Sequence, residues 1–260
     1  MAEISSRTSI VLPHDLPVVQ RMAAYGTIAK SLGVVENLRR ARHTSPELAQ
    51  RTHALRQWQS QRFRHCYADI LQDTHMGAAA HFFLSELYSE QEFSQRDAQF
   101  ARIAGTLERL FPQSVVQTAT LLAQLHALSE TLDACMAHTW LGVEQLNPVL
   151  TFNQLASLDI YQQLWHAMLA HSGYERARQE QLEATQELGL QLHRHTQVPG
   201  LRLMLKMMRA PATAAGLSDL QRFLERGFDT FGQLGRAGKV PQFLQTVMQR
   251  ETAWLEQMAA

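Results

Sequence analysis

Residues 45–73 read SPELAQRTHALRQWQSQRFRHCYADILQD, and this stretch decides the fold class. It opens with Ser45 and Pro46, residue types that are preferred at the N-cap and at the first position of an α-helix, and the acid Glu47 follows near the positive helix end. Apolar side chains then recur at helical spacing and predict a face that packs on a core: Leu48, Leu55, Trp58, Phe63, Tyr67 and Leu71. The polar face of the predicted helix is basic and carries Arg51, Arg56, Arg62 and Arg64.

The same helical period continues along the rest of the chain. No stretch shows the sustained alternation of a strand bounded by turn residues, and Asn-Gly and Asp-Gly pairs are absent. Glycine and proline cut the chain into helix-sized pieces. We therefore predict an all-α fold, a bundle of about nine helices. The clearest candidate boundary is a loop at 142–150, but the helices after it are as apolar as those before it, so we expect a single domain.

A short helix predicted over 77–88 is apolar around most of its circumference, which indicates a place in the core. Its core-forming residues are Ala80, Phe82, Phe83, Leu84 and Leu87. Four polar residues bracket the loop that follows this helix: Glu86, Tyr88, Arg96 and Asp97. Because buried polar groups must be paired, we expect these four to form a buried network that ties two helices together.

Composition limits the classes of partner. The chain has 24 Lys and Arg against 24 Asp and Glu, whereas a nucleic-acid-binding protein usually carries a basic excess that neutralises phosphates, so we expect no nucleic-acid partner. Residues 1–11 lack the apolar core of a secretory signal, and no apolar stretch is long enough to cross a bilayer. We expect a cytoplasmic protein without stable membrane insertion. The two cysteines, Cys66 and Cys135, fit small apolar helix residues in a reducing compartment.

The common signatures of enzymes are absent: the phosphate-binding and dinucleotide-binding glycine loops, H-E-x-x-H, G-x-S-x-G and the E-x-x-H pair of di-iron bundles. We therefore lean against an enzyme, assign no catalytic residue or metal ligand, and expect no cofactor.

The strongest polar constellation is His126, Glu130 and Asp133 within LHALSETLD, residues 125–133. Their spacing of i, i+4 and i+7 places them on one face of a helix. If that face borders a cavity, the three side chains would bind a ligand, orient a base or hold a metal ion. The alternative is a solvent-facing stripe beside buried leucines.

The segment LRLMLKMMR, residues 201–209, is a candidate contact surface. It carries a basic stripe of Arg202, Lys206 and Arg209 and an apolar stripe of Leu201, Met204, Leu205 and Met208. A flexible methionine surface beside cations suits a partner helix, an anionic ligand or a membrane surface, although nine residues before Pro211 are short for a membrane anchor. The alternative is a core helix with a solvated basic edge.

Longer motifs allow a comparison with known families: FFLSELYS (82–89), SQRDAQFARI (94–103), LFP (110–112), LHALSETLD (125–133), YERARQEQ (174–181) and LRLMLKMMRAPATAAGLSDLQRFLERGFDTF (201–231). They resemble an uncharacterised proteobacterial family with an FFLxxLY…DFxxRD block and a C-terminal LRxMRxPAxxAGLxxLQxFLExGF block. The resemblance covers about 45–258 and departs at Ser89, where the family usually has glycine. It implies a bacterial, cytoplasmic helical protein without an assigned activity, with a variable N-terminal helix over 1–44 and a helical domain over 45–260.

Three functions stay open on these observations. The leading hypothesis is a non-enzymatic regulatory or adaptor protein that acts through protein–protein contacts, including contacts with a second copy of itself as a homo-oligomer. The second is a small-ligand or heme-binding sensor whose cavity is lined by His126 and the helix 77–88. The third is a helical enzyme with a site formed by His126, Glu130 and Asp133.

Overall fold

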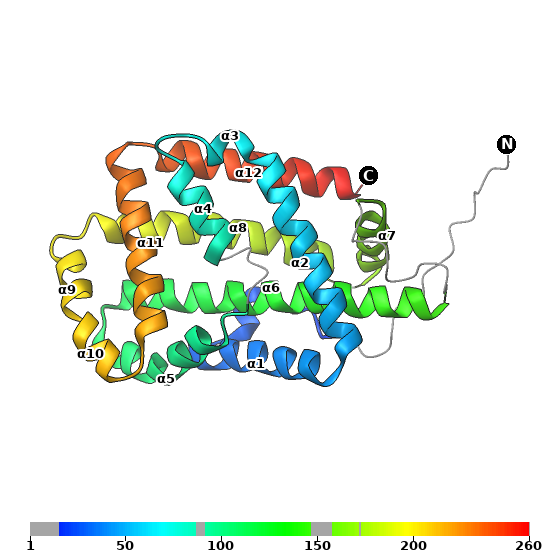
Figure 1. Ribbon diagram of the computed structural model, residues 1–260, viewed down its shortest axis with the longest axis horizontal. Helices are drawn as coiled ribbons and strands as arrows, with labels where there is room; N and C mark the ends of the chain where they lie inside the picture. Colours follow the sequence, from blue (N-terminus) through cyan, green and yellow to red (C-terminus); the bar gives the residue numbers. More distant parts are fainter. Residues whose placement is uncertain (1–15, 87–91, 147–157, 172, 260) are drawn as a thin grey trace.

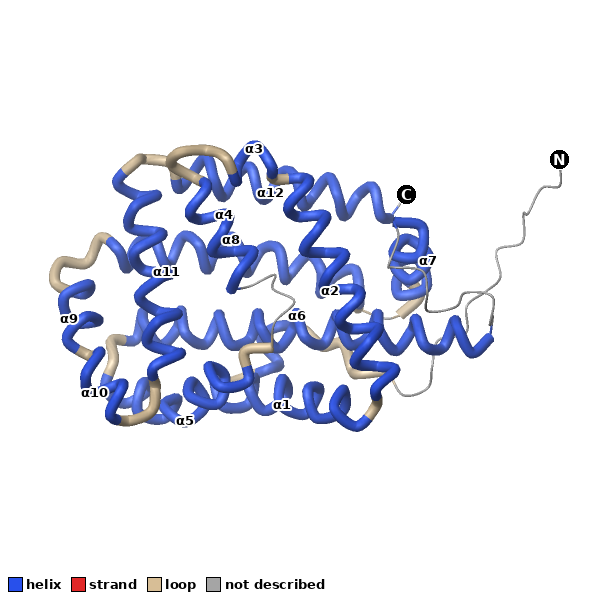
Figure 2. Tube along the Cα trace, in the orientation of Figure 1, coloured by secondary structure: helices blue, strands red, loops and turns tan. Residues whose placement is uncertain are grey.

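The computed structural model describes residues 16–86, 92–146, 158–171 and 173–259. Within these ranges every regular element is a helix and no strand occurs, so the predicted all-α fold in one domain is confirmed (Figure 2). In chain order the elements are a short 3-10 helix (Met22–Tyr25), α1 (Ile28–Thr44), α2 (Pro46–Cys66), α3 (Ala68–Leu71), α4 (Gly77–Glu86), α5 (Ser94–Leu110), α6 (Gln113–Leu146), α7 (Leu158–Leu169), α8 (Tyr174–Thr196), α9 (Leu201–Met207), α10 (Arg209–Ala214), α11 (Ser218–Arg236) and α12 (Val240–Ala259).

Local capping signals set the start of α2. The Ser45 hydroxyl accepts a hydrogen bond from the backbone N–H of Leu48, and Pro46 is the first helical residue, as predicted. A side-chain oxygen at this position satisfies one of the N–H groups that have no partner within the helix. The sequence therefore determines this helix start without help from the rest of the fold.

The end of α2 depends on a tertiary contact. The single helix predicted over 45–73 divides at Tyr67, where the backbone leaves helical geometry. The Tyr67 ring stacks on Phe63 with 4.2 Å between ring centroids, and its hydroxyl donates a hydrogen bond to Glu251 on α12. A similar division separates α9 from α10 at Met208, so the described helices outnumber the nine or so that we predicted.

The N-terminal helix predicted for 1–44 begins later than expected. Helix α1 starts at Ile28, where the hydroxyl of Thr27 accepts a hydrogen bond from the backbone N–H of Lys30. Residues 1–15 lie outside the described part of the chain. Because α1 packs along α6, it is an integral part of the bundle (Figure 1).

The loop predicted at 142–150 is also partly wrong, because α6 continues to Leu146. Leu141 and Val143 pack against the core there, which favours helical geometry beyond the expected end. The remaining predicted loop residues lie outside the described residues.

Helix α6, with 34 residues, is the axis of the bundle. In Figure 1 it crosses the middle of the molecule, with α1 along one side, α8 along the other and α2 crossing it. Helices α9 and α10 lie at one end of the molecule and α7 lies at the other. In the described ranges no helix combines the length and the hydrophobicity that a membrane span requires.

Two apolar clusters form most of the core. The first includes α4, where Phe83 lies 5.6 Å from Phe243 and 6.3 Å from Phe231 between ring centroids, which confirms the predicted burial of this helix. The second gathers α6, α7 and α8 around fully buried residues such as Leu132 and Tyr174. Leu87, Tyr88 and Ser89 lie outside the described residues. Helix α6 contributes to both clusters, and it carries His126, Glu130 and Asp133.

Candidate ligand-binding cavity

A cavity of about 140 Å³ lies against α6 and is lined by His126, Glu130 and Asp133. The spacing that placed these three side chains on one face is therefore correct, and that face borders an internal space. Glu130 is buried, and the other two are half-buried. Glu130 therefore does not face solvent, whereas His126 and Asp133 do so in part.

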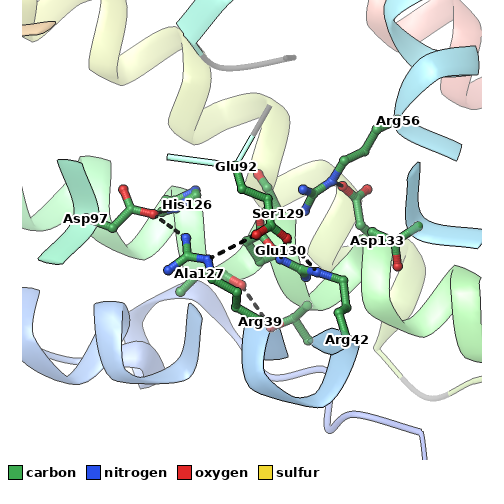
Figure 3. Close-up of polar contacts among 12 residues, drawn as sticks. Arg39, Arg42, Arg56, Glu92, Asp97, His126, Ala127, Ser129, Glu130 and Asp133 are labelled. Atoms are coloured by element: carbon green, nitrogen blue, oxygen red, sulfur yellow. Dashed lines mark hydrogen bonds and ion pairs between the residues drawn. The ribbon is translucent and has the colours of Figure 1, made fainter. Parts of the chain in front are cut away.

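Glu130 is held between two arginines that come from different helices. Arg42 on α1 donates to its carboxylate at 2.8 Å and Arg56 on α2 donates at 2.6 Å, and both guanidinium groups are buried (Figure 3). Arg56 also donates to Asp133 at 3.2 Å, so it joins two acids of α6. Burial raises the pKa of Glu130, but the charges of Arg56 and Arg42 outweigh this effect and lower the pKa to about 2.

His126 pairs with Asp97 of α5 rather than with an acid of its own helix. Its Nε2 atom lies 3.0 Å from Oδ2 of Asp97, and Arg39 of α1 donates to the same oxygen at 2.8 Å (Figure 3). Burial raises the pKa of Asp97, whereas His126 and Arg96 lower it to about 2 overall. Asp97 is thus an ionised acceptor that fixes the orientation of the imidazole.

The predicted network between α4 and α5 is present. Arg96 lies 3.4 Å from carboxylate oxygens of both Glu86 and Asp97, and all three side chains are largely buried. Arg226 of α11 adds a second ion pair to Glu86. Tyr88, the fourth member that we predicted, lies outside the described residues. This network joins α4, α5 and α11 at one end of the cavity.

These partners weigh against a metal centre. In the described part of the chain, no three or more His, Cys, Asp or Glu side chains are arranged to hold a metal ion. Guanidinium groups occupy the carboxylates of Glu130 and Asp133, and His126 bonds with Asp97. The face of α6 presents ion pairs to the cavity instead of free ligands.

Another part of the cavity wall is aromatic and was not predicted from the sequence. It is formed by Tyr161 and Trp165 of α7 and by Trp254 of α12. Tyr161 stacks on Trp58 with 4.1 Å between ring centroids, and this contact fixes the position of the Tyr161 ring. The i, i+4 spacing of Tyr161 and Trp165 was the only sequence signal that these rings share a face.

Arg178 of α8 also lines the cavity, and sequence reasoning missed it. It is 8% exposed and donates hydrogen bonds to the Tyr174 hydroxyl, the Gln181 side-chain oxygen and the Met136 sulfur. All of these acceptors are uncharged. In YERARQEQ, Arg178 looks like one of several charged residues on an amphipathic helix, so only the tertiary structure distinguishes it.

The predicted contact surface at 201–209 lies outside the cavity. Its basic residues face acids of α11: Arg202 donates to Asp229 at 2.6 Å and Arg209 donates to Glu225 at 2.6 Å. Lys206 is exposed. The predicted apolar stripe divides, because Leu201 and Leu205 are half-buried whereas Met204 and Met208 are exposed. Leu203 and Met207, which we did not assign to it, are the most exposed apolar residues of the segment, at 61% and 63%.

Comparison with known proteins gives one match. The model of a family described as Domain of unknown function (DUF8198) matches residues 38–260, from within α1 to the last residue of the chain. No curated protein and no solved structure matches.

Proposed function

This chain belongs to the family described as Domain of unknown function (DUF8198), and we propose that it binds a small molecule in its central cavity. The observation that carries the proposal is the cavity of about 140 Å³, whose wall combines buried ion pairs with aromatic rings. Among the functions that the sequence left open, the ligand-binding alternative accounts for this wall best.

The energetics of the wall support the proposal. Protein interiors are close-packed, and a void in the core lowers stability because its lining loses contacts. Burying charged groups lowers stability further, because the loss of their hydration can exceed the attraction within an ion pair. A cavity that is lined by Asp97, Glu130 and Arg56 carries both costs at once. Concave sites with apolar walls and a few fixed polar groups are typical of small-molecule binding.

The size of the cavity limits the ligand. An engineered apolar cavity of about 150 Å³ admits benzene, whereas drug-sized ligands occupy pockets of about 300–1,000 Å³. The cavity here therefore suits a molecule with one six-membered ring or its equivalent. Heme is too large for it, so we do not propose the heme-sensor alternative.

A cavity-filling variant tests the proposal. Ser129 lines the cavity, and Ser129→Leu would occupy part of it, whereas Ser114→Leu alters an exposed position of the same helix. The probes are benzoate, benzyl alcohol and benzylamine, and the measurement is the thermal unfolding temperature. A ligand present at about 100 times its Kd stabilises the folded state by about 2.7 kcal/mol.

We expect at least one probe to raise the unfolding temperature of the parent and of Ser114→Leu, but not that of Ser129→Leu. If no probe raises it, or if Ser129→Leu responds as the parent does, the central cavity is not a ligand site and the proposed function is wrong.

The exposed apolar face of α9 favours a second candidate function, the regulatory or adaptor role. Leu203, Met204, Met207 and Met208 are exposed within two helical turns, and clustered exposed apolar side chains mark interaction sites. Methionine adapts its shape to a partner surface. We propose a second copy of the chain as the partner.

Sedimentation velocity over a range of protein concentrations tests this self-association. Met207→Glu should abolish any concentration-dependent increase in mass, whereas Leu110→Glu, which alters an exposed apolar residue of α5, should not. A parent protein that stays monomeric at every concentration would contradict the proposed homo-oligomer.

A further inference from the structure

The charges along the cavity wall are balanced at every position but one. Each carboxylate that lines the cavity has an arginine partner: Glu86 and Asp97 pair with Arg96, Glu130 and Asp133 pair with Arg56, and Glu251 pairs with Arg62. Arg178 is the fourth arginine of the wall. It has no carboxylate at ion-pairing distance among the described residues.

The groups around Arg178 do not supply the negative charge that would balance its guanidinium group. Tyr174, its main acceptor, is fully buried, and burial raises the pKa of this phenol far above its usual value, so it stays neutral at pH 7. Burial lowers the pKa of Arg178, but Tyr174, Tyr161 and Asp133 raise it and prevail, so the guanidinium stays charged. Asp133 acts from beyond ion-pairing distance and already accepts from Arg56. A buried cation without a counter-anion is costly, which indicates that an anion from outside the chain completes the site.

A donor beside Arg178 has no hydrogen-bond acceptor among the described residues. Trp165 is 2% exposed, and its Nε1 atom has no hydrogen-bond partner among the described residues. The guanidinium carbon of Arg178 lies 5.5 Å from the Trp165 ring centroid, so the two groups belong to the same part of the wall. Both can only donate hydrogen bonds. A carboxylate, with two anionic oxygens, is the complementary acceptor.

The rings of this part of the wall specify the body of the ligand. Tyr161 lies 6.3 Å from Trp165 and 6.2 Å from Trp254 between ring centroids, so aromatic faces border the donors. Such a wall favours a planar apolar group. We propose that the cavity takes a small aromatic carboxylate, whose carboxylate group bonds with Arg178 and Trp165 and whose ring packs on Tyr161 and Trp254. This inference rests on the proposed function and names its ligand class.

Calorimetric titration with matched probes tests the ligand class. Benzoate carries both the ring and the charge, benzyl alcohol lacks the charge, and acetate and phosphate lack the ring. Benzoate should bind most tightly to the parent protein. Binding of benzyl alcohol without benzoate would leave the proposed function intact and overturn the inference, whereas binding of none of these probes would contradict both. Acetate or phosphate binding as tightly as benzoate would show that the rings do not select the ligand.

Two variants test the residues. Arg178→Met keeps an apolar stem and should weaken benzoate binding at least about tenfold, because hydrogen bonds to charged groups are the strong ones, while benzyl alcohol binding should not change. Arg250→Met removes a cation that pairs with Asp69 at the surface and serves as the matched control. Equal benzoate affinity in Arg178→Met and the parent would overturn the inference.

Trp165→Phe keeps an aromatic ring at this position and removes the indole N–H, so it carries the test if Arg178→Met does not fold. It should weaken benzoate binding and leave benzyl alcohol binding unchanged. In nuclear magnetic resonance spectra, the indole N–H signal that this variant lacks should shift when benzoate is added to the parent. A signal that does not move with saturating benzoate would exclude the Trp165 hydrogen bond.

Discussion

Two arrays of arginine–carboxylate pairs, one inside the bundle and one on its surface, look alike in sequence and differ in environment. In the internal array, Arg42 and Arg56 converge on Glu130 of α6, and Arg56 is 8% exposed (Figure 3). In the surface array, Arg202 and Arg209 reach Asp229 and Glu225 of α11, with side-chain exposures of 49% and 60% for the arginines. The internal array joins two arginines of different helices to one acid, and the surface array joins two arginines of one segment to two acids of one helix.

The environment decides what each array contributes. On the surface, water replaces either partner when the other is removed, so exposed ion pairs add little to stability. Inside the bundle, removing one partner takes an ion pair away from a charge that stays buried, which is destabilising. Similar donor–acceptor distances therefore do not mean similar contributions to stability, and the comparison can be tested residue by residue.

The largest effect is expected from Glu130→Ala. This change removes the shared acceptor of Arg42 and Arg56 and leaves Arg42 with Glu92 and Arg56 with Asp133, so it should lower the free energy of unfolding by about 3 kcal/mol, the low end for a broken buried pair. Urea denaturation measures the change. Glu225→Ala removes the corresponding acid of the surface array and should have a much smaller effect. Equal losses in the two variants would show that burial does not distinguish the arrays.

The second largest effect on stability is expected from acid pH, which protonates buried carboxylates. The pKa values of Glu130 and Asp97 are lowered to about 2, from ordinary values of 4.5 and 3.8. Because the folded state favours the ionised forms, their contribution to stability is complete above about pH 4.5 and is lost as the pH falls toward about 2. For Glu130 alone the full contribution is about 3 kcal/mol.

Urea denaturation between about pH 5 and pH 2.5 should show this loss in the parent. Glu130→Gln removes one of the two titrating groups, so its stability should fall less steeply over that range. If Glu130→Gln and the parent show the same pH dependence, Glu130 is not the source of the acid sensitivity.

Charge reversal on the surface should have a smaller effect. In the variant that changes Arg202, Lys206 and Arg209 to Glu, two new carboxylates face Asp229 and Glu225. Mild repulsion should lower the thermal unfolding temperature slightly, by much less than Glu130→Ala does. Reversal of Lys206 alone should leave the temperature unchanged. A global loss of folding in the triple variant would mean that the surface array contributes as much to stability as the internal one.

The smallest expected difference between the two arrays is their response to salt. At about 1 M salt the Debye length falls to about 3 Å, so exposed charges are screened, whereas buried pairs are screened much less. Any difference in unfolding temperature between the parent and Arg209→Ala should disappear in high salt, but the deficit of Glu130→Ala should persist. A deficit of Glu130→Ala that also disappears would place Glu130 in contact with solvent.

Much of the fold could be predicted because its signals are local. The Ser45–Pro46 start, the helical period and the shared face of His126, Glu130 and Asp133 all depend on residues within a few turns of one another. The polar face of α2 shows where this reasoning stops. Arg56 fits a solvated basic surface by its sequence neighbours, yet it is buried against acids that lie more than 70 residues away along the chain.

The sequence by itself determined that this protein is helical, where α2 and α4 begin, and which residues share a helix face, since backbone hydrogen bonds and caps act over three or four residues. The tertiary structure alone decided which arginines are buried and which carboxylates they meet. It also decided that Arg178, which has no carboxylate partner among the described residues, and Trp165, whose indole N–H has no acceptor there, line one cavity. These features depend on how α2, α7 and α8 pack around α6, and packing is a sum of contacts between residues far apart in the chain.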